Sequence, residues 1–468
     1  MSVAVLLSLS VARAQSRAPE WSQFQGSPAH AGETSAADGG PAPPYRVRWT
    51  LPAPDGTSLS GAAIVGSTAV TVGREAVYGV DLASGEVVWE VERDEGPLSV
   101  PAVGEADGRI VLLYLEGPPA GATPSPTPTP TPTPTPSPGS EEPADVGSSL
   151  VALDIEDRAE RWRADLGAVA RSGVTVDAGT AYVSDQAGVV HAVGLDGVER
   201  WTAQVGGRAD LPLATGDGHV YAVSRDPDER RVAITALAVE DGERLWRVSP
   251  QIGSTAVSAP AAVDGGVVVG TADRLVRKLG ADDGEERWNS LALSLFSPVS
   301  SPATGGGAVL VADIGGGLYL LDPGDGSRRW GFQFNELILR SSPVRSGGVA
   351  LVGLNDGRLG AVDLETGRLV WRGGPTPGLV GTIAVSGDAV VAVKGGPEAG
   401  LIAFEHDPAA TLVDAPSPTE LALGTTLARA SLAALAVFVV AYGLGLLGRR
   451  RFGDAFGPEE VGEPEEEA

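Results

Sequence analysis

Few residues of this chain have the type and spacing that catalysis or metal binding requires. The four histidines, His30, His191, His219 and His406, lie far apart, and none falls in a metal-binding motif such as His-Glu-x-x-His. No Gly-x-Ser-x-Gly elbow and no phosphate-binding glycine loop occurs. The chain has no cysteine, which excludes disulfides, thiolate metal ligands and cysteine nucleophiles. The sequence therefore predicts no catalytic residue and no metal ligand.

The amino-acid composition excludes one class of partner for this protein. The chain has 468 residues and a formal net charge of −26, so it carries too little positive charge to hold the phosphates of a nucleic acid. Only Lys278 and Lys394 are lysines, so 32 of the 34 cationic residues are arginines. An acid-rich, lysine-poor surface stays hydrated in concentrated salt, which favours a halophilic source. A GC-rich genome that favours arginine codons would produce the same bias.

The tryptophan residues mark an internal repeat in the sequence, and this repeat determines where the predicted strands lie. Apart from Trp21, the tryptophans recur about every 41 residues once one insertion of 32 residues is removed. Seven of the eight end a segment related to Leu-Asp-x-x-x-Gly-x-x-x-Trp, most completely at 80–89 and 362–371, and Trp49 does not. Their fixed place in the repeat predicts packing between neighbouring units rather than stacking on a ligand. The eight residues are Trp49, Trp89, Trp162, Trp201, Trp246, Trp288, Trp330 and Trp371.

A second recurring segment precedes the tryptophans and completes a four-stranded unit. Ser-x-Pro occurs at 99–101, 258–260, 300–302 and 341–343, and a glycine-rich turn and a β-branched run follow it. About four short strands per repeat predict one blade of a β-propeller. Eight first strands are expected, near Gly61, Ser99, Gly173, Leu211, Ala259, Ser301, Ser342 and Gly381.

The number of blades depends on how the two ends of the repeat region combine. The last unit, 379–405, offers three strands and no tryptophan, whereas 45–51 is a lone strand that contains one. Pairing these two segments would complete the last blade and close the ring without an open edge. We therefore predict an all-β, eight-bladed β-propeller over residues 45–408, with seven blades as the alternative.

The repeat pattern resembles the PQQ-like β-propeller family, which includes the assembly factor BamB and the quinoprotein dehydrogenases. The resemblance rests on the Asp-to-Trp turns, the Ser-x-Pro starts and a lead-in at 21–30 (WSQFQGSPAH) similar to the family's W-x-x-F-x-G-x-x-x-H, and it covers about residues 21–406. A quinoprotein would hold PQQ and Ca²⁺ in its central funnel, where many use a vicinal disulfide that this chain cannot form. We expect a non-enzymatic module without cofactors that binds or scaffolds protein partners, with a PQQ- and Ca²⁺-dependent dehydrogenase as the alternative.

The N-terminal end and one insertion indicate export. Residues 1–14 resemble a signal peptide without a positive start, and a lead-in follows over 15–44. The insertion at 116–147 contains TPSPTPTPTPTPTPSP, in which alternate prolines block helix and strand pairing. Exported segments rich in threonine and proline are often O-glycosylated, and a spacer with no role is the alternative.

The C-terminal end indicates a membrane anchor. After a linker at 409–423, residues 424–448 are long and apolar enough to cross a bilayer once. Arg449, Arg450 and Arg451 begin an acidic tail at 449–468, and by the positive-inside rule they place this tail in the cytoplasm. We therefore expect a single-pass protein of the cell membrane with its propeller outside.

Overall fold

The structure, a computed structural model, describes residues 19–117, 147–226, 231–250, 256–291, 296–298, 300–374, 378, 380–396 and 398–409. The chain divides into two units, 1–413 and 414–468, and all of these residues belong to the first. The predicted signal peptide, the membrane segment at 424–448, the acidic tail and most of the insertion at 116–147 lie outside the described residues. Within the described ranges, no helix has the length and apolar character needed to cross a bilayer.

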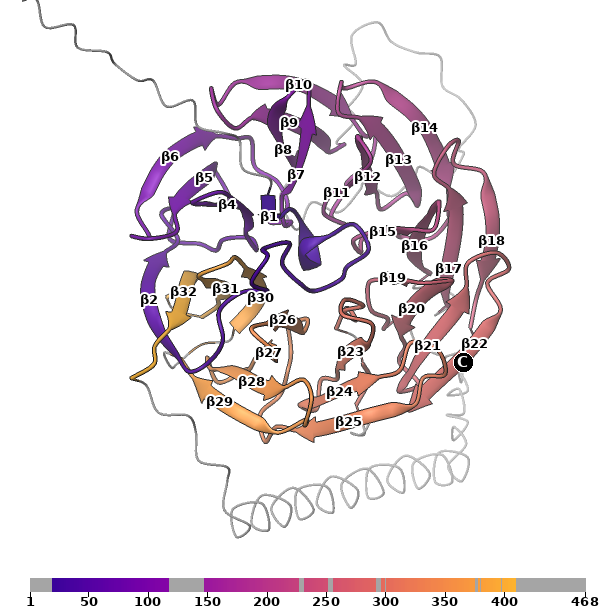
Figure 1. Cartoon of the computed structure of the whole chain (residues 1–468). Helices are drawn as coiled ribbons and strands as arrows, with labels where there is room; N and C mark the ends of the chain where they lie inside the picture. The colour runs from indigo at the N-terminus through magenta and orange to yellow at the C-terminus, as the bar shows by residue number, and fades with distance from the viewer. Residues whose placement is uncertain are drawn as a thin grey trace, which may run out of the picture. The chain divides into compact units, whose positions relative to one another are not determined.

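Eight antiparallel sheets stand as blades around a central axis, with the fourth strand of each blade at the rim (Figure 1). Blade 1 consists of β3 (Ala63–Val65), β4 (Thr68–Val72), β5 (Ala76–Asp81) and β6 (Val87–Glu92), and blade 2 of β7 (Ala102–Ala106), β8 (Arg109–Glu116), β9 (Ser149–Asp154) and β10 (Glu160–Asp165). Blade 3 consists of β11 (Thr175–Asp177), β12 (Thr180–Ser184), β13 (Val189–Gly194) and β14 (Glu199–Gln204), and blade 4 of β15 (Ala214–Gly216), β16 (His219–Asp226), β17 (Arg231–Ala238) and β18 (Arg244–Val248).

The second half of the ring repeats this order with two variations. Blade 5 consists of β19 (Ala261–Val263), β20 (Gly266–Gly270), β21 (Leu275–Gly280) and β22 (Glu286–Leu291), and blade 6 of β23 (Val309–Ala312), β24 (Gly317–Leu321) and β25 (Arg328–Gln333). Blade 7 consists of β26 (Val344–Ser346), β27 (Val349–Gly353), β28 (Leu359–Asp363) and β29 (Leu369–Gly373), and blade 8 of β30 (Val380–Val385), β31 (Val390–Lys394), β32 (Gly400–His406) and β2 (Tyr45–Pro52). In blade 6 the first strand is reduced to a bridge between Ala303 and Leu310.

The N-terminal strand β2 closes the ring on the C-terminal strand β32. The two pair antiparallel from Tyr45 opposite His406 to Pro52 opposite Gly400. This pairing confirms the prediction that the lone strand completes the last blade, and the count of eight blades makes the seven-bladed alternative wrong. Seven of the eight predicted first strands begin within three residues of their predicted starts, and the eighth is the bridge at Ala303.

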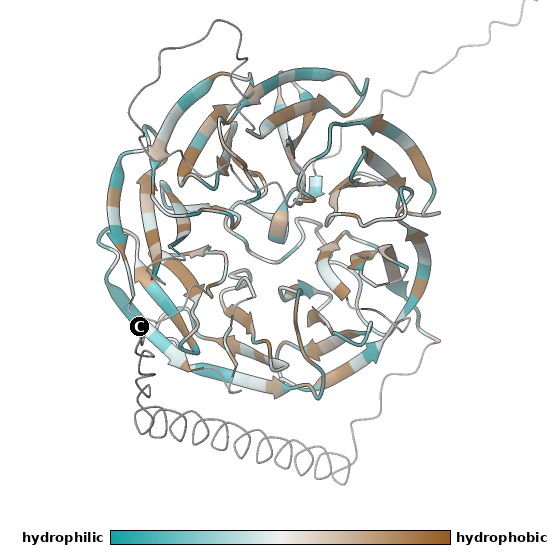
Figure 2. Cartoon of the chain, turned by 180° about the vertical axis from the view of Figure 1, so that it is seen from behind, coloured by the Kyte–Doolittle hydropathy of each residue, from teal (hydrophilic) through white to brown (hydrophobic). Residues whose placement is uncertain are grey.

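The core lies between blades, which explains why the second and third strands read as nearly continuous apolar runs. Val267, Val268 and Val269 of β20 are all fully buried, because alternate side chains face the two neighbouring blades. One apolar cluster joins blades 1 and 2, and another joins blades 2 and 3. The rim strands instead alternate polar and apolar residues, as the striped colours of the outer strands show in Figure 2.

The ring has two ends that its topology distinguishes. In an antiparallel blade the turns between strands 1 and 2 and between strands 3 and 4 lie at one end, which we name the turn face. The turns between strands 2 and 3 and the connections from one blade to the next lie at the other end, which we name the loop face. The insertion at 116–147 joins β8 to β9, the second and third strands of blade 2, and therefore leaves the ring at the loop face.

Candidate functional site

The repeat tryptophans lie where neighbouring blades meet. In six of them the indole N–H donates, over 2.5–3.0 Å, to a carbonyl in the turn between the third and fourth strands of the next blade. The pairs are Trp49–Leu82, Trp162–Leu195, Trp201–Val239, Trp246–Ala281, Trp288–Pro323 and Trp330–Leu364. Trp371 packs edge-on against Tyr45 of blade 8, with ring centroids 5.1 Å apart. Trp89 packs against the apolar cluster that blades 1 and 2 share.

A glycine in the same turn lets six of the eight indoles approach the next blade. At Gly242, where φ is +73°, an added Cβ would lie 2.5 Å from the Trp201 ring. The same contact, at 2.5–2.7 Å, recurs in five other blades at Gly85, Gly197, Gly284, Gly326 and Gly367. Blade 2 has Arg158 with φ +60° in its corresponding turn, opposite Trp89. The Gly in the sequence repeat is therefore part of the contact between blades.

In two of the Ser-x-Pro starts, at 258–260 and 341–343, the serine holds the first strand of its blade to the second. Ser258 is fully buried, and its hydroxyl accepts the backbone N–H of Gly270 at 2.8 Å. Ser341 accepts the N–H of Gly353 at the same spacing of twelve residues, also at 2.8 Å. Ser60 and Ser172, which lack the proline, form the equivalent contact. These hydroxyls satisfy buried backbone groups, and sequence reasoning did not assign them this role.

The lead-in crosses the ring at the turn face, where Figure 1 shows it over the central axis with the short 3-10 helix η1 (Phe24–Gly26). Its strand β1 (Pro19–Trp21) pairs with β3 of blade 1. Backbone or side-chain hydrogen bonds of 2.6–2.9 Å then reach each remaining blade. They join Ser22 to Val103, Gln23 to Val176, Pro28 to Thr215, Ala29 to Ala262, Ala31 to Gly305, Gly32 to Arg345 and Glu20 to Gly387.

Two buried polar side chains of the lead-in extend this contact. The Gln23 amide donates to the Val176 carbonyl at 3.1 Å and accepts the Val176 N–H at 2.6 Å, as a neighbouring strand would. His30 lies 2.5 Å from the Pro260 carbonyl through Nδ1, which must carry the proton because a carbonyl only accepts. Burial lowers the pKa of His30 to about 4, and the Pro260 hydrogen bond opposes this shift in part. His30 is therefore neutral and structural.

The described first strands that surround the central axis begin with small residues and bring together no cluster of Ca²⁺ ligands. The first strands begin with small residues that contact one another: a Cβ on Gly61 would lie 2.8 Å from Thr382, and the Ser301 N–H donates to the Ser342 hydroxyl at 3.1 Å. Calcium takes about six to eight oxygen ligands, many of them carboxylates. Among the residues that the structure describes, no three His, Cys, Asp or Glu side chains gather to hold a metal. The described residues therefore offer no cluster of this kind for Ca²⁺.

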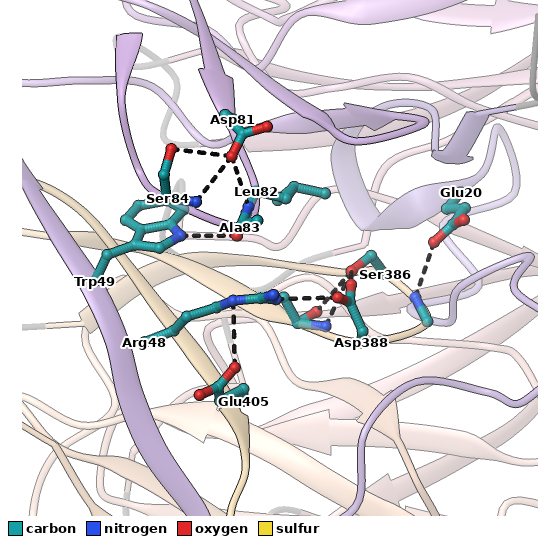
Figure 3. Close-up of polar contacts among 12 residues, drawn as sticks. Glu20, Arg48, Trp49, Asp81, Leu82, Ala83, Ser84, Ser386, Asp388 and Glu405 are labelled. Carbon is teal, nitrogen blue, oxygen red and sulfur yellow. Dashed lines mark hydrogen bonds and ion pairs between the residues drawn. The ribbon is translucent and has the colours of Figure 1, made fainter. Parts of the chain in front are cut away.

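A charged groove lies beside the ring closure, where β2 completes blade 8 (Figure 3). Arg48 lies between two carboxylates, 3.0 Å from Asp388 and 3.2 Å from Glu405. The Glu20 carboxylate accepts the Gly387 N–H at 2.8 Å. A cavity of about 370 Å³ lies beside them, lined by Asp38, Gly40, Pro41, Ala42, Arg48, Gly387, Asp388, Glu405 and His406. The ion pairs of Arg48 join β2 to Asp388 and to β32, so they help to fasten the closure of the ring.

Four large apolar side chains are exposed on adjacent connections of the loop face. Leu291 is the last residue of β22, and Phe296 lies in the passage from blade 5 to blade 6. Leu337 and Leu339 lie in the passage from blade 6 to blade 7. Their exposed fractions are 37–51%. We name these four residues the apolar loop surface. Apolar side chains gathered on the outside of a protein are typical of a binding surface.

The loop that carries Leu337 and Leu339 is held in a fixed conformation. Ile338, between the two leucines, is 2% exposed and anchors the loop in the core of blades 6 and 7. The Leu337 N–H donates to the Asn355 side chain at 3.1 Å, and the Asn355 N–H donates back to the Leu337 carbonyl at 3.0 Å. Arg358 and Arg372 each lie 2.9 Å from the Glu336 carboxylate. The two leucines are therefore presented on an ordered framework.

The structure does not bring the other sequence-derived site residues into one centre. His191 is buried in blade 3, 3.1 Å from the Asp185 carboxylate, while His219 and His406 are on blades 4 and 8. Arg449, Arg450 and Arg451 lie outside the described residues. The apolar loop surface was missed, although the segment NELILR at 335–340 contains its signal. Only the fold shows that its alternate leucines face solvent around a buried isoleucine.

The fold and these contacts define an eight-bladed β-propeller whose blades dock through Asp-to-Trp turns. Residues 146–257 and 250–334 match the family described as outer membrane protein assembly factor BamB. Over these residues the chain is therefore similar to the PQQ-like β-propeller family. No curated protein sequence matches it.

Solved structures with this fold belong to proteins of different kinds. BamB from Moraxella catarrhalis is 16% identical, with a TM-score of 0.53, over 77% of this chain and 100% of that one. The computationally designed protein Ika8 is 14% identical, with a TM-score of 0.57 and the same coverage. A quinohemoprotein alcohol dehydrogenase, ADHIIG, from Pseudomonas putida HK5 is 13% identical, with a TM-score of 0.54, over 85% and 82% of the two chains. Identities this low establish the fold alone.

Proposed function

We propose that this protein is a non-enzymatic module that binds or scaffolds a partner protein through the loop face of its propeller. The observation that carries the proposal is the apolar loop surface of Leu291, Phe296, Leu337 and Leu339. Because Ile338 and Asn355 hold the leucines in place, little side-chain or loop entropy is lost when a partner covers them. The partner therefore offers an apolar patch of its own that fits between two neighbouring connections.

The sequence supports a place for this module at the cell surface. We propose that the propeller is extracytoplasmic and anchored in the cell membrane by residues 424–448, with Arg449 to Arg451 on the cytoplasmic side. The signal-like residues 1–14 support export. The insertion at 116–147 leaves the ring at the loop face and is the segment where we expect O-glycans.

A photo-crosslinking amino acid at position 339, introduced into the full chain in intact cells, tests the binding role. We expect one discrete adduct of higher mass, because a bound partner would cover this position. The same amino acid in place of Val198, which is 53% exposed on the rim of blade 3, is the matched control and should give no such adduct. The second variant Leu337→Glu should remove the adduct from position 339.

Two results would contradict the proposal. The first is an adduct of the same mass and yield from both positions, which would indicate chance collisions. The second is dye reduction by the purified full chain incubated with PQQ and Ca²⁺, which would favour the dehydrogenase instead.

A further inference from the structure

The rim strand of blade 1 differs from the rim strands of the other seven blades. In those seven, an arginine stands directly before or after the repeat tryptophan. They are Arg48, Arg161, Arg200, Arg247, Arg287, Arg329 and Arg372. In β6 the neighbours of Trp89 are Val88 and Glu90, and the strand contains no cationic residue. Charged side chains on an edge strand discourage pairing with other chains, and β6 lacks the arginine that its counterparts share.

The side chains of β6 leave an exposed edge with apolar and acidic character. Val87 is 37% exposed and Val88 53% exposed, and among the strands that the structure describes β6 pairs only with β5. Glu86, Glu90 and Glu92 are also exposed, and among the described residues none of the three forms an ion pair. On other rim strands, Glu160 of β10 and Glu286 of β22 have cationic partners within 3 Å, Arg163 and Arg277. Glu199 of β14 lies 3.9 Å from His191.

We propose that β6 is a second docking edge, which takes an extended segment of a partner protein as an additional strand of blade 1. An edge strand presents alternate N–H and C=O groups to such a segment, and these main-chain groups supply hydrogen bonds that do not depend on sequence. The exposed valines and unpaired carboxylates supply the selectivity. The segment that fits them alternates apolar residues with arginine or lysine.

The same charges disfavour a second copy of this chain as the occupant. Two β6 edges side by side would bring Glu90 and Glu92 of both copies together, and like charges on neighbouring strands are destabilising. This proposal concerns the rim, whereas the proposed function rests on the loop face. Either surface can therefore fail its test without the other.

A fluorescent synthetic peptide of alternating arginine and valine, titrated into the full-length chain, tests the edge. We expect saturable binding by fluorescence anisotropy that weakens as salt is added. Val88→Arg gives β6 the arginine found on the other rim strands and should weaken binding about tenfold, since it repels the peptide and covers the edge. Val198→Arg, which changes an equally exposed valine next to β14, should leave binding unchanged.

A peptide of the same charge with proline at alternate positions separates strand addition from attraction of charge alone. It lacks the N–H groups that a strand donates, so we expect it not to bind. The proposal is overturned if the proline peptide binds as well as the first, or if neither peptide binds. Equal binding by wild type and Val88→Arg would also overturn it. So would self-association of the wild type that Val88→Arg abolishes, since it would assign the edge to a second copy.

Discussion

Single tryptophans join one blade to the next. Trp201 is buried between blades 3 and 4, donates to the Val239 carbonyl at 2.9 Å and lies against Gly242. We expect Trp201→Ala to lower the free energy of unfolding by about 3–5 kcal/mol, because it removes a large buried ring and leaves a cavity. Trp201→Phe keeps most of the ring and should lose about 1–2 kcal/mol. Chemical denaturation measures both values, and a loss under 1 kcal/mol in the alanine variant would contradict the packing role.

His30 gives the molecule a defined sensitivity to acid. Its pKa is about 4 in the folded protein, against an ordinary value of 6.5, because burial disfavours the charged ring. The unfolded chain therefore binds more protons between these values. Its contribution to stability is complete above pH 6.5 and is lost as the pH falls towards 4, by about 3 kcal/mol in total.

Measuring the free energy of unfolding between pH 7 and pH 4 tests this account. We expect His30→Gln to remove most of the slope in this range, whereas His406→Gln, at an exposed position, should retain it. Carboxyl groups such as Asp81, whose pKa the Ser84 N–H lowers from 3.8, lose their stabilisation only at lower pH. A slope that is unchanged in His30→Gln would show that another group is responsible.

At the scale of elements, the lead-in ties the first strands together at the turn face. Gln23 reaches Val176 in blade 3 with two hydrogen bonds from one buried side chain. Gln23→Glu replaces the donor with a carboxylate that faces the Val176 carbonyl, so we expect the free energy of unfolding to fall by about 2–3 kcal/mol. Gln204→Glu makes the same change at an exposed residue that also donates to a carbonyl, and should cost less than about 1 kcal/mol. Equal losses in the two variants would contradict the role of Gln23.

The sequence predicted elements where one chemical pattern repeats. The Asp-to-Trp turns and β-branched runs located the strands, and the lone tryptophan at Trp49 indicated that β2 completes blade 8. The first strand of blade 6 was not predictable in its reduced form, since the run Gly305 to Gly307 reads like the other glycine turns. The contacts of the lead-in could not be predicted from the sequence either. His30 and Pro260 are 230 residues apart, and no local pattern joins them.

At the scale of the whole ring, two independent structures hold the ends of the propeller together. One is the pairing of β2 with β32, supported by Arg48 with Asp388 and Glu405. The other is the lead-in, which contacts all eight blades. In the closed ring each blade has an inner edge, which the lead-in contacts, and an outer edge at its rim strand, so both proposed docking surfaces lie on a rigid body. The arrangement of neighbouring blades determines which side chains are exposed, including Leu337 and Val88. The candidate binding surfaces therefore depend on the ring as a whole.

The whole fold depends on the pairing of β2 with β32, and a single crosslink tests this pairing. Arg46 and Glu405 are opposite each other on β2 and β32, with their side chains 2.6 Å apart. Because the natural chain has no cysteine, Arg46→Cys with Glu405→Cys introduces the only two thiols. Mild oxidation should join them within one chain in high yield, and Arg46→Cys with Glu90→Cys should stay reduced. Free thiols in the first variant, or disulfides between chains, would contradict a ring closed by its two ends.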